Sequence, residues 1–189
     1  MGKEFELKFA ATPAQQRCVV EEFGNFSTIE METTYYDTPE GAFSAEKMTL
    51  RRRFENGVSV CTLKAPAGLH SRREFEVEAE SIEAALKILC KLAGREDLAA
   101  STLVSVCGAR FSRLAKTLEL EDCTVEIAVD AGVLVAGHRQ IPLCEIEVEL
   151  KTGSEDGAVA FANMLAAKHG LHPEPKSKFR RALELAQED

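Results

Sequence analysis

Charged and apolar residues alternate along several segments of the chain, and the first of these is KEFELKF at positions 3–9. Glu4, Glu6 and Lys8 occupy one parity of this segment, and aromatic residues and a leucine occupy the other. Because successive side chains of a strand point to opposite faces, the pattern predicts a strand with one charged face and one apolar face. A charged face of this kind is usually solvated.

The same alternation predicts further strands over 48–66, 73–80, 116–137 and 144–153. Asn56-Gly57 divides the first of these ranges and is a strong signal for a tight hairpin. Turns are expected near Asp122 and Gly137. The strands therefore fall into two groups, separated by residues 81–106.

Helical signals occupy most of the remaining chain. Thr12-Pro13 is a helix start and Gly24 a helix stop, and Ser81 and Gly94 bracket a second helix in the same way. Two more helices are expected over 155–170 and 176–187, and a short helical piece over 96–106. Helices combined with antiparallel strands indicate the α+β class.

Sorting every strand by parity collects many charges onto shared faces. The residues gathered in this way are Glu4, Glu6, Lys8, Arg51, Arg53, Glu55, Lys64, Arg72, Glu74, Glu76, Glu78, Glu126, Asp130, Glu145, Glu147, Glu149 and Lys151. Two architectures fit the pattern: a sheet whose charged face is solvated, and a barrel whose inner face is charged. In the barrel, the clustered carboxylates favour a hard divalent cation, Mg²⁺ or Mn²⁺, and the basic residues favour a chain of phosphates.

Composition limits the classes of function. The 189 residues are 45% hydrophobic and 29% charged, which is typical of one globular domain spanning 1–189. A formal net charge of −8 argues against a general binder of nucleic acid or of anionic membranes. The six cysteines show neither zinc-ligand nor redox spacing, and no signal peptide or membrane-spanning segment is evident, so we expect a cytoplasmic protein.

The ordered set EFELK, YYDTPEGAFSAEKMTLRRR, CTLKAP, SRREFEVE, VEIAVDAG, CEIEVELKTG and KSKFRRAL resembles the CYTH superfamily of triphosphate tunnel metalloenzymes, nearest to its bacterial inorganic triphosphatases. The resemblance runs from Glu4 to about Arg181. It implies an eight-stranded antiparallel tunnel with a charged lumen, covered outside by helices, and metal-dependent hydrolysis of a small anionic triphosphate. The helical CHAD domain that follows in some members is not expected here.

The resemblance also implies roles for individual residues. The residues that it implies as metal ligands are Glu4, Glu6, Glu126, Glu145, Glu147 and Glu149. The further residues that it places in the lumen are Glu74, Glu76 and Asp130. Substrate binding falls to Lys8, Arg51, Arg53, Lys64, Arg72, Arg113 and Lys178, with Arg110 and Lys176 as competitors for the last two positions. Catalysis, as activation or orientation of the attacking water, falls to Lys8, Glu6, Glu147 and Glu149, with Glu4 also a candidate.

Several charged residues have simpler interpretations. Asp37 is expected to form a turn before Thr38-Pro39, and Arg52 and Arg73 have the wrong parity for the lumen. Solvent exposure is expected for Glu55, Glu78, Glu80 and Lys151.

Other functions stay open at this point. A class IV-type adenylate cyclase or a thiamine triphosphatase would use the same tunnel, and a non-catalytic module would bind polyphosphate or nucleotides without turnover. The absence of Trp and the presence of only two Tyr residues favour a compact inorganic substrate over a nucleotide. The sequence does not distinguish a monomer from a homodimer.

Overall fold

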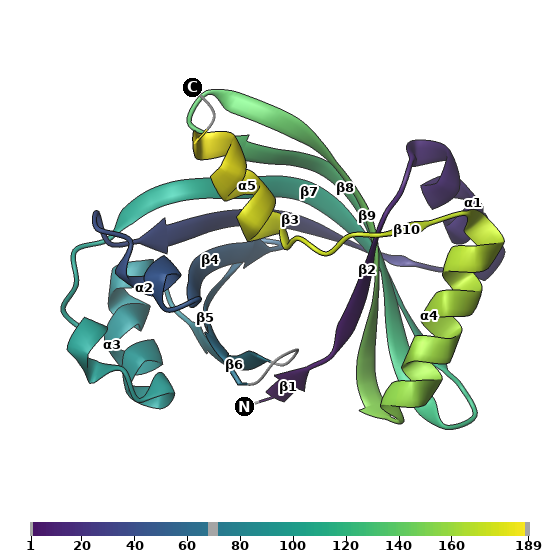
Figure 1. Ribbon diagram of the computed structural model, residues 1–189, viewed down its shortest axis with the longest axis horizontal. Coiled ribbons are helices and arrows are strands. Elements are labelled where there is room, and N and C mark those ends of the chain that lie inside the picture. The colour runs from purple at the N-terminus through teal and green to yellow at the C-terminus, as the bar shows by residue number, and fades with distance from the viewer. Residues whose placement is uncertain (1, 68–71, 188–189) are drawn as a thin grey trace.

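Ten strands form one antiparallel sheet with helices around it, in the computed structural model of the protein (Figure 1). The structure describes residues 2–67 and 72–187, with the backbone alone for residues 2–4. The strands are β1 (Gly2–Glu4), β2 (Glu6–Ala10), β3 (Ser27–Asp37), β4 (Thr49–Glu55), β5 (Val58–Pro66), β6 (Arg72–Glu78), β7 (Val104–Glu119), β8 (Cys123–Ala136), β9 (Arg139–Gly153) and β10 (His172–Pro173). The helices are α1 (Pro13–Phe23), α2 (Ala42–Ala45), α3 (Ile82–Ala93), α4 (Glu155–His169) and α5 (Lys178–Gln187), with a 3-10 turn at Glu96–Leu98. The expected α+β class is confirmed.

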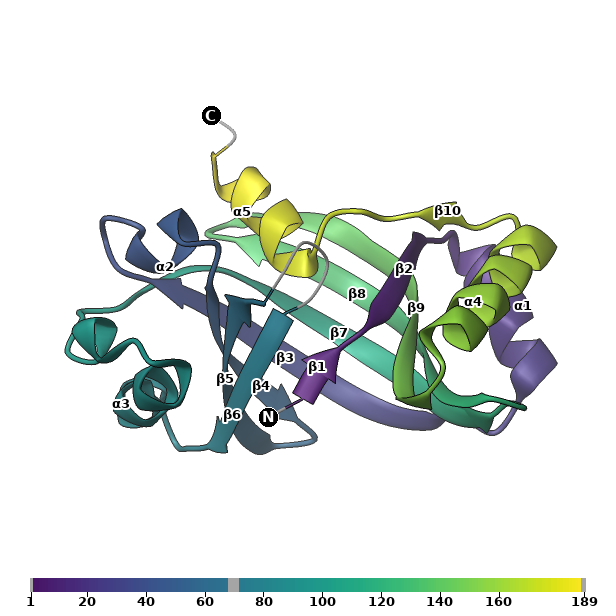
Figure 2. The same ribbon diagram turned by 60° about the horizontal axis from the view of Figure 1, so that its bottom comes forward.

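The N-terminal segment pairs with strands from both ends of the sheet order, which reads β1-β6-β5-β4-β3-β7-β8-β9-β2-β10. Strand β1 pairs with β6 and strand β2 pairs with β9, and only Phe5 separates β1 from β2. The Leu150 backbone N–H of β9 donates to the Phe5 carbonyl at 2.9 Å. Figure 2 shows this segment running between the β6 edge and β9.

The turn and capping signals of the sequence are confirmed. Asn56 and Gly57 both have positive φ, 49° and 88°, as a two-residue hairpin between β4 and β5 requires. The Thr12 and Ser81 side chains accept from backbone N–H groups three residues later and cap α1 and α3. Among the described helices, none is long and apolar enough to cross a membrane.

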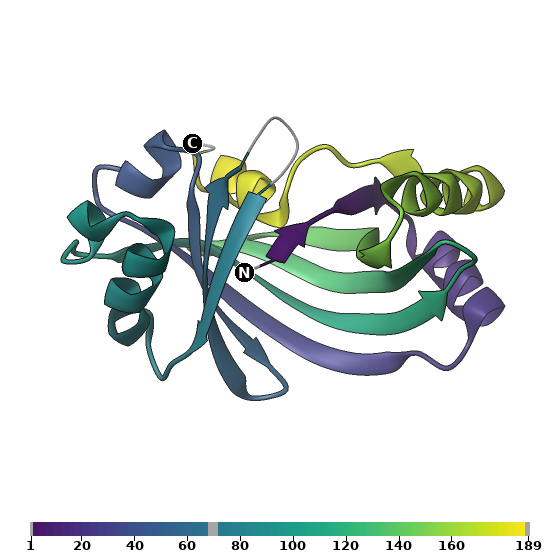
Figure 3. The same cartoon turned by 90° about the horizontal axis from the view of Figure 1, so that it is seen from below.

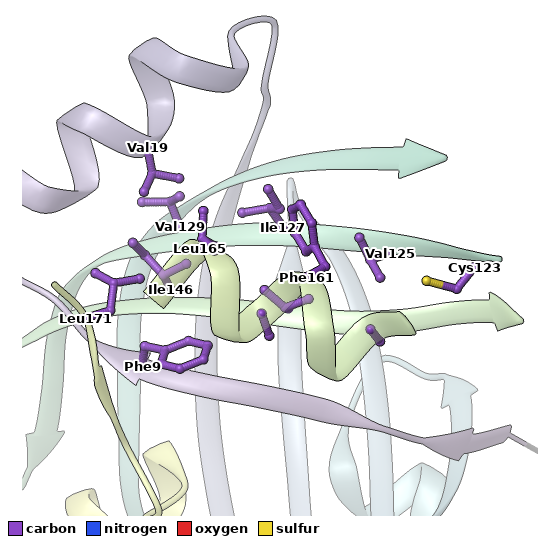
Figure 4. Packing of buried hydrophobic residues seen from close by; sticks show 13 residues of the cluster. Phe9, Val19, Cys123, Val125, Ile127, Val129, Ile146, Phe161, Leu165 and Leu171 are labelled. Atoms are coloured by element: carbon purple, nitrogen blue, oxygen red, sulfur yellow. The ribbon is translucent and has the colours of Figure 1, made fainter. Parts of the chain in front are cut away.

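Two apolar clusters join helices to the face of the sheet opposite the charges. Val125, Ile127 and Ile146 pack against Phe161 and Leu165 of α4 and against α1, as Figure 4 shows. On the other half of the sheet, α3 packs against β5 and β6, and its Ile82, Leu86 and Leu89 belong to an apolar cluster that also includes residues of β4. Figure 3 shows α3 at one end of the molecule and α1 with α4 at the other.

Helix α5 lies on the charged face, so the expectation that helices cover the outside alone is wrong for this helix. Its Ala182 and Leu185 are buried against Ala109, Leu134 and Leu143. These strand residues share the parity of Arg113, Asp130 and Glu145, respectively. The charged face therefore becomes apolar towards one end, and the apolar side of α5 covers that end.

The strands also extend beyond the expected ranges. Strand β7 begins at Val104, so the helical piece expected over 96–106 is limited to Glu96–Leu98. Strand β3 is an addition to the strands that the pattern predicts, and β3 and β7 pair over most of their length. The two predicted strand groups consequently form one continuous sheet.

Candidate active site

A cavity of about 390 Å³ lies over the charged face of the sheet. Its charged lining residues are Glu6, Lys8, Arg51, Arg53, Glu55, Lys64, Arg72, Glu74, Glu76, Arg113, Glu126, Glu147, Glu149, Lys151 and Lys178. The parity analysis therefore identified a face that encloses a cavity. Of the remaining predicted site residues, Asp130 and Glu145 lie buried behind the cavity wall, and the side chain of Glu4 falls outside the described residues.

The structure distinguishes the competing basic residues by position. Arg113 lines the cavity, whereas Arg110 is exposed and does not. Lys178 lines the cavity, whereas Lys176 is exposed and forms an ion pair with Glu184 at 2.8 Å.

At the cavity wall, three carboxylates have oxygens within 4.8 Å of one another: Glu147, which lines the cavity, and Asp130 and Glu145 behind it. Lys178 contacts all three of them, with Nζ at 2.8 Å from Asp130 and 2.7 Å from Glu147. We call these three acids the buried acidic triad. The arrangement of one lysine among three acids ties the first turn of α5 to β8 and β9.

Two arginines complete the neutralisation of the buried acidic triad. Arg113 donates to both oxygens of Asp130, at 2.8 and 2.7 Å, and to Glu147 at 2.5 Å. Arg181 Nη2 lies 2.9 Å from Glu145. Three cations thus face three carboxylates.

This balance of charge shifts the pKa values. Burial alone would raise the pKa of Glu147, but Lys178 and Arg113 hold that pKa well below its usual range. Burial alone would lower the pKa of Lys178, but the three carboxylates raise it well above its usual range. Both groups therefore stay charged at neutral pH, and the triad already has cations in place of a metal.

A second set of carboxylates is arranged as a row across three strands. Glu6 of β2 is the direct partner of Glu149 of β9, and Glu149 is the direct partner of Glu126 of β8. We call these three residues the acidic row. All three line the cavity, and directly opposed side chains of antiparallel strands lie about 5 Å apart at Cβ. Like charges at this spacing repel one another unless a cation lies among them.

Two lysines accompany the acidic row. Lys8 Nζ lies 3.5 Å from Glu6, and Lys151 Nζ lies 2.8 Å from Glu149 and 3.3 Å from Glu126. Lys151 was expected to face solvent and is exposed, but because strand alternation continues past Glu149 it also lines the cavity. Burial alone would lower the pKa of Lys151, but its bonds to Glu149 and Glu126 raise it.

The opposite wall of the cavity, built by β4, β5 and β6, carries four basic residues interspersed with Glu55, Glu74 and Glu76, and we call it the basic wall. Arg51 and Lys64 share Glu74 at 3.2 and 3.3 Å, and Arg72 donates to Thr49 at 3.3 Å. Burial, together with neighbouring Arg51, lowers the pKa of Arg53. The Nε atoms of Arg51 and Arg53 are buried without a hydrogen-bond partner in the part of the chain that is described.

The basic wall also corrects one expectation and confirms others. Glu55 was expected in solvent but forms an ion pair with Arg53 at the cavity, because β4 keeps its alternation up to the hairpin. Arg52 donates to Ser59 at 2.8 Å and lies over the Phe54 ring, and Arg73 is exposed, as their parity predicts. Glu78 and Glu80 are exposed, as expected.

Asp37 confirms its predicted turn role. Its carboxylate accepts from the backbone N–H groups of Thr38, Phe43 and Ser44 at 2.8, 2.9 and 3.0 Å. The side chain is therefore fully engaged in holding the turn between β3 and α2.

Some lining residues were not among the candidates, namely Ile29, Met31, Thr33, Tyr35, Thr49, Phe111, Ser177 and Phe179. Thr49 and Phe111 share the parity of the charged lining residues of β4 and β7, whereas the lining residues of β3 alternate with Glu30 and Glu32, so parity did not indicate them. Ser177 and Phe179 reach the cavity only because α5 packs on the charged face.

The two acidic sets differ in their fit to a divalent metal. The donor set of the acidic row consists of carboxylate oxygens beside a cavity, which suits Mg²⁺ or Mn²⁺. The oxygens of the buried acidic triad are already in contact with Lys178, Arg113 and Arg181. Of the acids that the structure describes, the row is the better metal site.

Comparison with known proteins assigns the chain to a family. An inorganic triphosphatase of Haemophilus influenzae is 31% identical over 96% of this chain, and the chain spans 54% of that protein, about half its length. A solved structure from Hippeastrum, described as a candidate adenylyl cyclase with a dominant triphosphatase activity, has a TM-score of 0.68 at 17% identity, over 96% of this chain and 95% of that one. A Pyrococcus horikoshii structure has a TM-score of 0.63 at 23% identity, over 96% and 99% of the two chains. The CYTH domain family matches residues 2–183, so the chain belongs to that family.

Proposed function

We propose that this protein hydrolyses the terminal phosphate of a triphosphate, and that its main substrate is inorganic triphosphate, which yields diphosphate and phosphate. The observation that carries the proposal is a cavity in which a basic wall faces an acidic row. An anion-binding protein would need the basic wall alone, whereas phosphoryl transfer also uses a metal held by carboxylates. The likeness to the Haemophilus influenzae inorganic triphosphatase supports the choice of substrate.

The fold that we propose for this activity is a closed tunnel. Strands β1 and β2 are consecutive parts of one N-terminal strand, and they pair with β6 and β9. If they are counted as one strand, this strand and β3 to β9 make eight antiparallel strands around the cavity. Closure would exclude bulk water and strengthen every charge interaction in the cavity.

On the basic wall, Arg51, Arg53, Lys64 and Arg72 bind the phosphate chain. Arginine donates to two phosphate oxygens at once, and lysine acts as a compact charge. The buried Nε atoms of Arg51 and Arg53 support this role, because phosphate oxygens would provide the acceptors that the described protein groups do not. Lys178 and Arg113 also line the cavity and would add positive charge there.

At the acidic row, Glu6, Glu126 and Glu149 hold Mg²⁺ or Mn²⁺. A divalent ion bound there supplies positive charge to the phosphate oxygens and lowers the pKa of a water molecule. Glu6 or Glu149 would orient the attacking water towards the terminal phosphorus, and Lys8 would stabilise the charge that develops on the phosphate oxygens. The water oxygen would form the new P–O bond as diphosphate leaves with the electrons of the old one, and the proton that the water loses would pass to the phosphate products or to solvent.

Glu145 and Glu147, which the resemblance offered as metal ligands, have a different role in this proposal. Together with Asp130 they fix Lys178, Arg113 and Arg181 and so attach α5 to the sheet. Glu147 is also a weak proton acceptor, because its pKa is held well below the usual range.

The test is phosphate release from inorganic triphosphate, ATP and thiamine triphosphate with Mg²⁺, Mn²⁺ or EDTA. We expect metal-dependent turnover, highest with inorganic triphosphate, and a loss of about a hundredfold or more in Glu149→Gln. Glu32→Gln, an exposed change on β3, is the matched control and should behave as the wild type. If no substrate is hydrolysed while triphosphate still raises the melting temperature, the protein is a binding module and the proposal is wrong.

A further inference from the structure

Lys151 lies where a cation is needed by the acidic row. Its Nζ contacts Glu149 at 2.8 Å and Glu126 at 3.3 Å, and these two carboxylates are direct neighbours across β8 and β9. The register between β8 and β9 shifts beside Thr124 and Val125, which pair with Thr152 and Leu150. Lys151 therefore lies at a bulge and has no direct pairing partner on β8. The bulge is close to the start of β8 and to the end of β9.

The ion pairs of Lys151 resemble the contacts that a divalent ion would make. The ammonium group bridges two carboxylates from different strands and reduces their repulsion. Its side chain is 36% exposed, so the group lies near water and can leave the row without carrying a buried charge through the protein. In contrast, Lys178 contacts its three acids with a side chain that is only 11% exposed.

We propose that Lys151 is an internal competitor of the metal: it neutralises Glu126 and Glu149 when the acidic row holds no metal, and a divalent ion must displace it. This inference depends on the metal site of the proposed function. Lys151 thus sets the affinity for the metal and keeps the acids in position until the metal arrives. It is a positioning residue, because it acts through Glu126 and Glu149.

The test is binding of Mn²⁺ alone, without substrate, followed by the electron paramagnetic resonance signal of free Mn²⁺. In Lys151→Met the competitor is absent, so we expect a dissociation constant lower by about two- to tenfold. Lys151→Arg keeps the positive charge and should bind Mn²⁺ with an affinity closer to that of the wild type. Lys87→Met removes one exposed lysine of α3 and controls for the change in net charge.

The outcomes separate this inference from the proposed function. Equal or weaker Mn²⁺ binding in Lys151→Met overturns the inference, while binding that is lost in Glu149→Gln keeps the metal site. Tighter binding in both Lys151→Met and Lys151→Arg also overturns it, since charge would then not be the cause. If neither the wild type nor Lys151→Met binds Mn²⁺, both proposals fail. Melting curves of each variant in EDTA identify a variant that has lost its fold, and the competition is then tested with Lys151→Gln.

Discussion

Three successive arginines of β4 illustrate how position alone gives one residue type different roles. Arg51 and Arg53 line the cavity, while Arg52 lies on the other face, over the Phe54 ring. The three side chains have the same chemistry, so a difference between their variants reports the face on which each one lies.

The first prediction compares two of these arginines. Arg53→Gln removes a charged donor from the phosphate chain, and charged hydrogen bonds contribute about 1.5–3 kcal/mol. We therefore expect kcat/KM for inorganic triphosphate to fall by about ten- to a hundredfold. Arg52→Gln should stay within about twofold of the wild type, because Arg52 points away from the cavity. Similar losses in both variants would contradict the assignment of Arg53 to the substrate.

The second prediction concerns Lys178, whose ammonium group contacts the three acids of the buried acidic triad. Lys178→Met leaves these acids with two arginines. Breaking a buried ion pair by removing one partner costs about 3–5 kcal/mol, so the free energy of unfolding in urea should fall by about that amount. The matched change Lys176→Met removes an exposed lysine and should cost less than about 1 kcal/mol. A Lys178→Met protein as stable as Lys176→Met would show that the network contributes no stability.

Residue-level prediction from the sequence succeeded where strands alternate regularly. The parity of Arg51, Arg53 and Lys64 indicated the cavity wall, and that of Arg52 indicated the outside. It missed that Glu55 and Lys151 also line the cavity, because their positions near strand ends suggested solvent alone although alternation continued through them. The choice between Arg110 and Arg113 depended on the register of β7, which a single sequence does not encode locally.

At the scale of elements, close approach between strands constrains β8. Gly132 pairs with Phe111 of β7 and with Leu143 of β9. A Cβ at this position would lie 2.2 Å from the Arg110 carbonyl oxygen and 2.5 Å from the Phe111 Cα. These are backbone atoms of a paired strand, so they cannot move without disturbing the ladder.

The third prediction follows from that approach. Gly132→Ala should lower the free energy of unfolding by about 1–3 kcal/mol, the usual cost of overpacking, as measured by urea denaturation. Ala131→Ser, at the adjacent exposed position, is the control and should cost less than about 0.5 kcal/mol. If Gly132→Ala is as stable as the control, β7 and β8 are further apart than described.

Helices and turns that are marked by capping or turn residues could be predicted from the sequence. How these elements pack against one another could be predicted less well. The caps at Thr12 and Ser81 and the Asn56-Gly57 turn are encoded within a few residues. The position of α5 on the charged face depends on packing against Leu134 and Leu143, which are far from α5 in sequence. No local sequence signal indicates that these leucines contact the helix. Pattern reasoning therefore identified α5 as a helix but did not predict the face that it covers.

At the scale of the whole molecule, four basic residues interspersed with glutamates lie on one side of the cavity, and a row of glutamates accompanied by two lysines lies on the other. The basic wall belongs to β4, β5 and β6, and the acidic row and buried acidic triad belong to β2, β8 and β9. These two halves have separate apolar clusters with separate helices, α3 on one side and α1 with α4 on the other. Each half of the sheet is therefore anchored from outside, and the charges that repel one another within a half are held in place by packing. Protonation of the acids should consequently affect the stability of the entire fold.

The last prediction is a pH dependence of stability that arises from Glu147. The pKa of this carboxyl is lowered in the folded protein, and in the unfolded chain it returns to about 4.3. Between these two values the unfolded state binds a proton that the folded state does not, so the free energy of unfolding rises with pH. The stabilisation by Glu147 is complete above the unfolded pKa and is lost as the pH falls towards the folded one. Urea denaturation in EDTA between about pH 5 and pH 3 should therefore show a smaller slope in Glu147→Gln than in the wild type, whatever the absolute stability of the variant. Glu78→Gln, an exposed change on β6, should keep the wild-type slope, and an equal slope in Glu147→Gln would mean that Glu147 is not held ionised by Lys178 and Arg113.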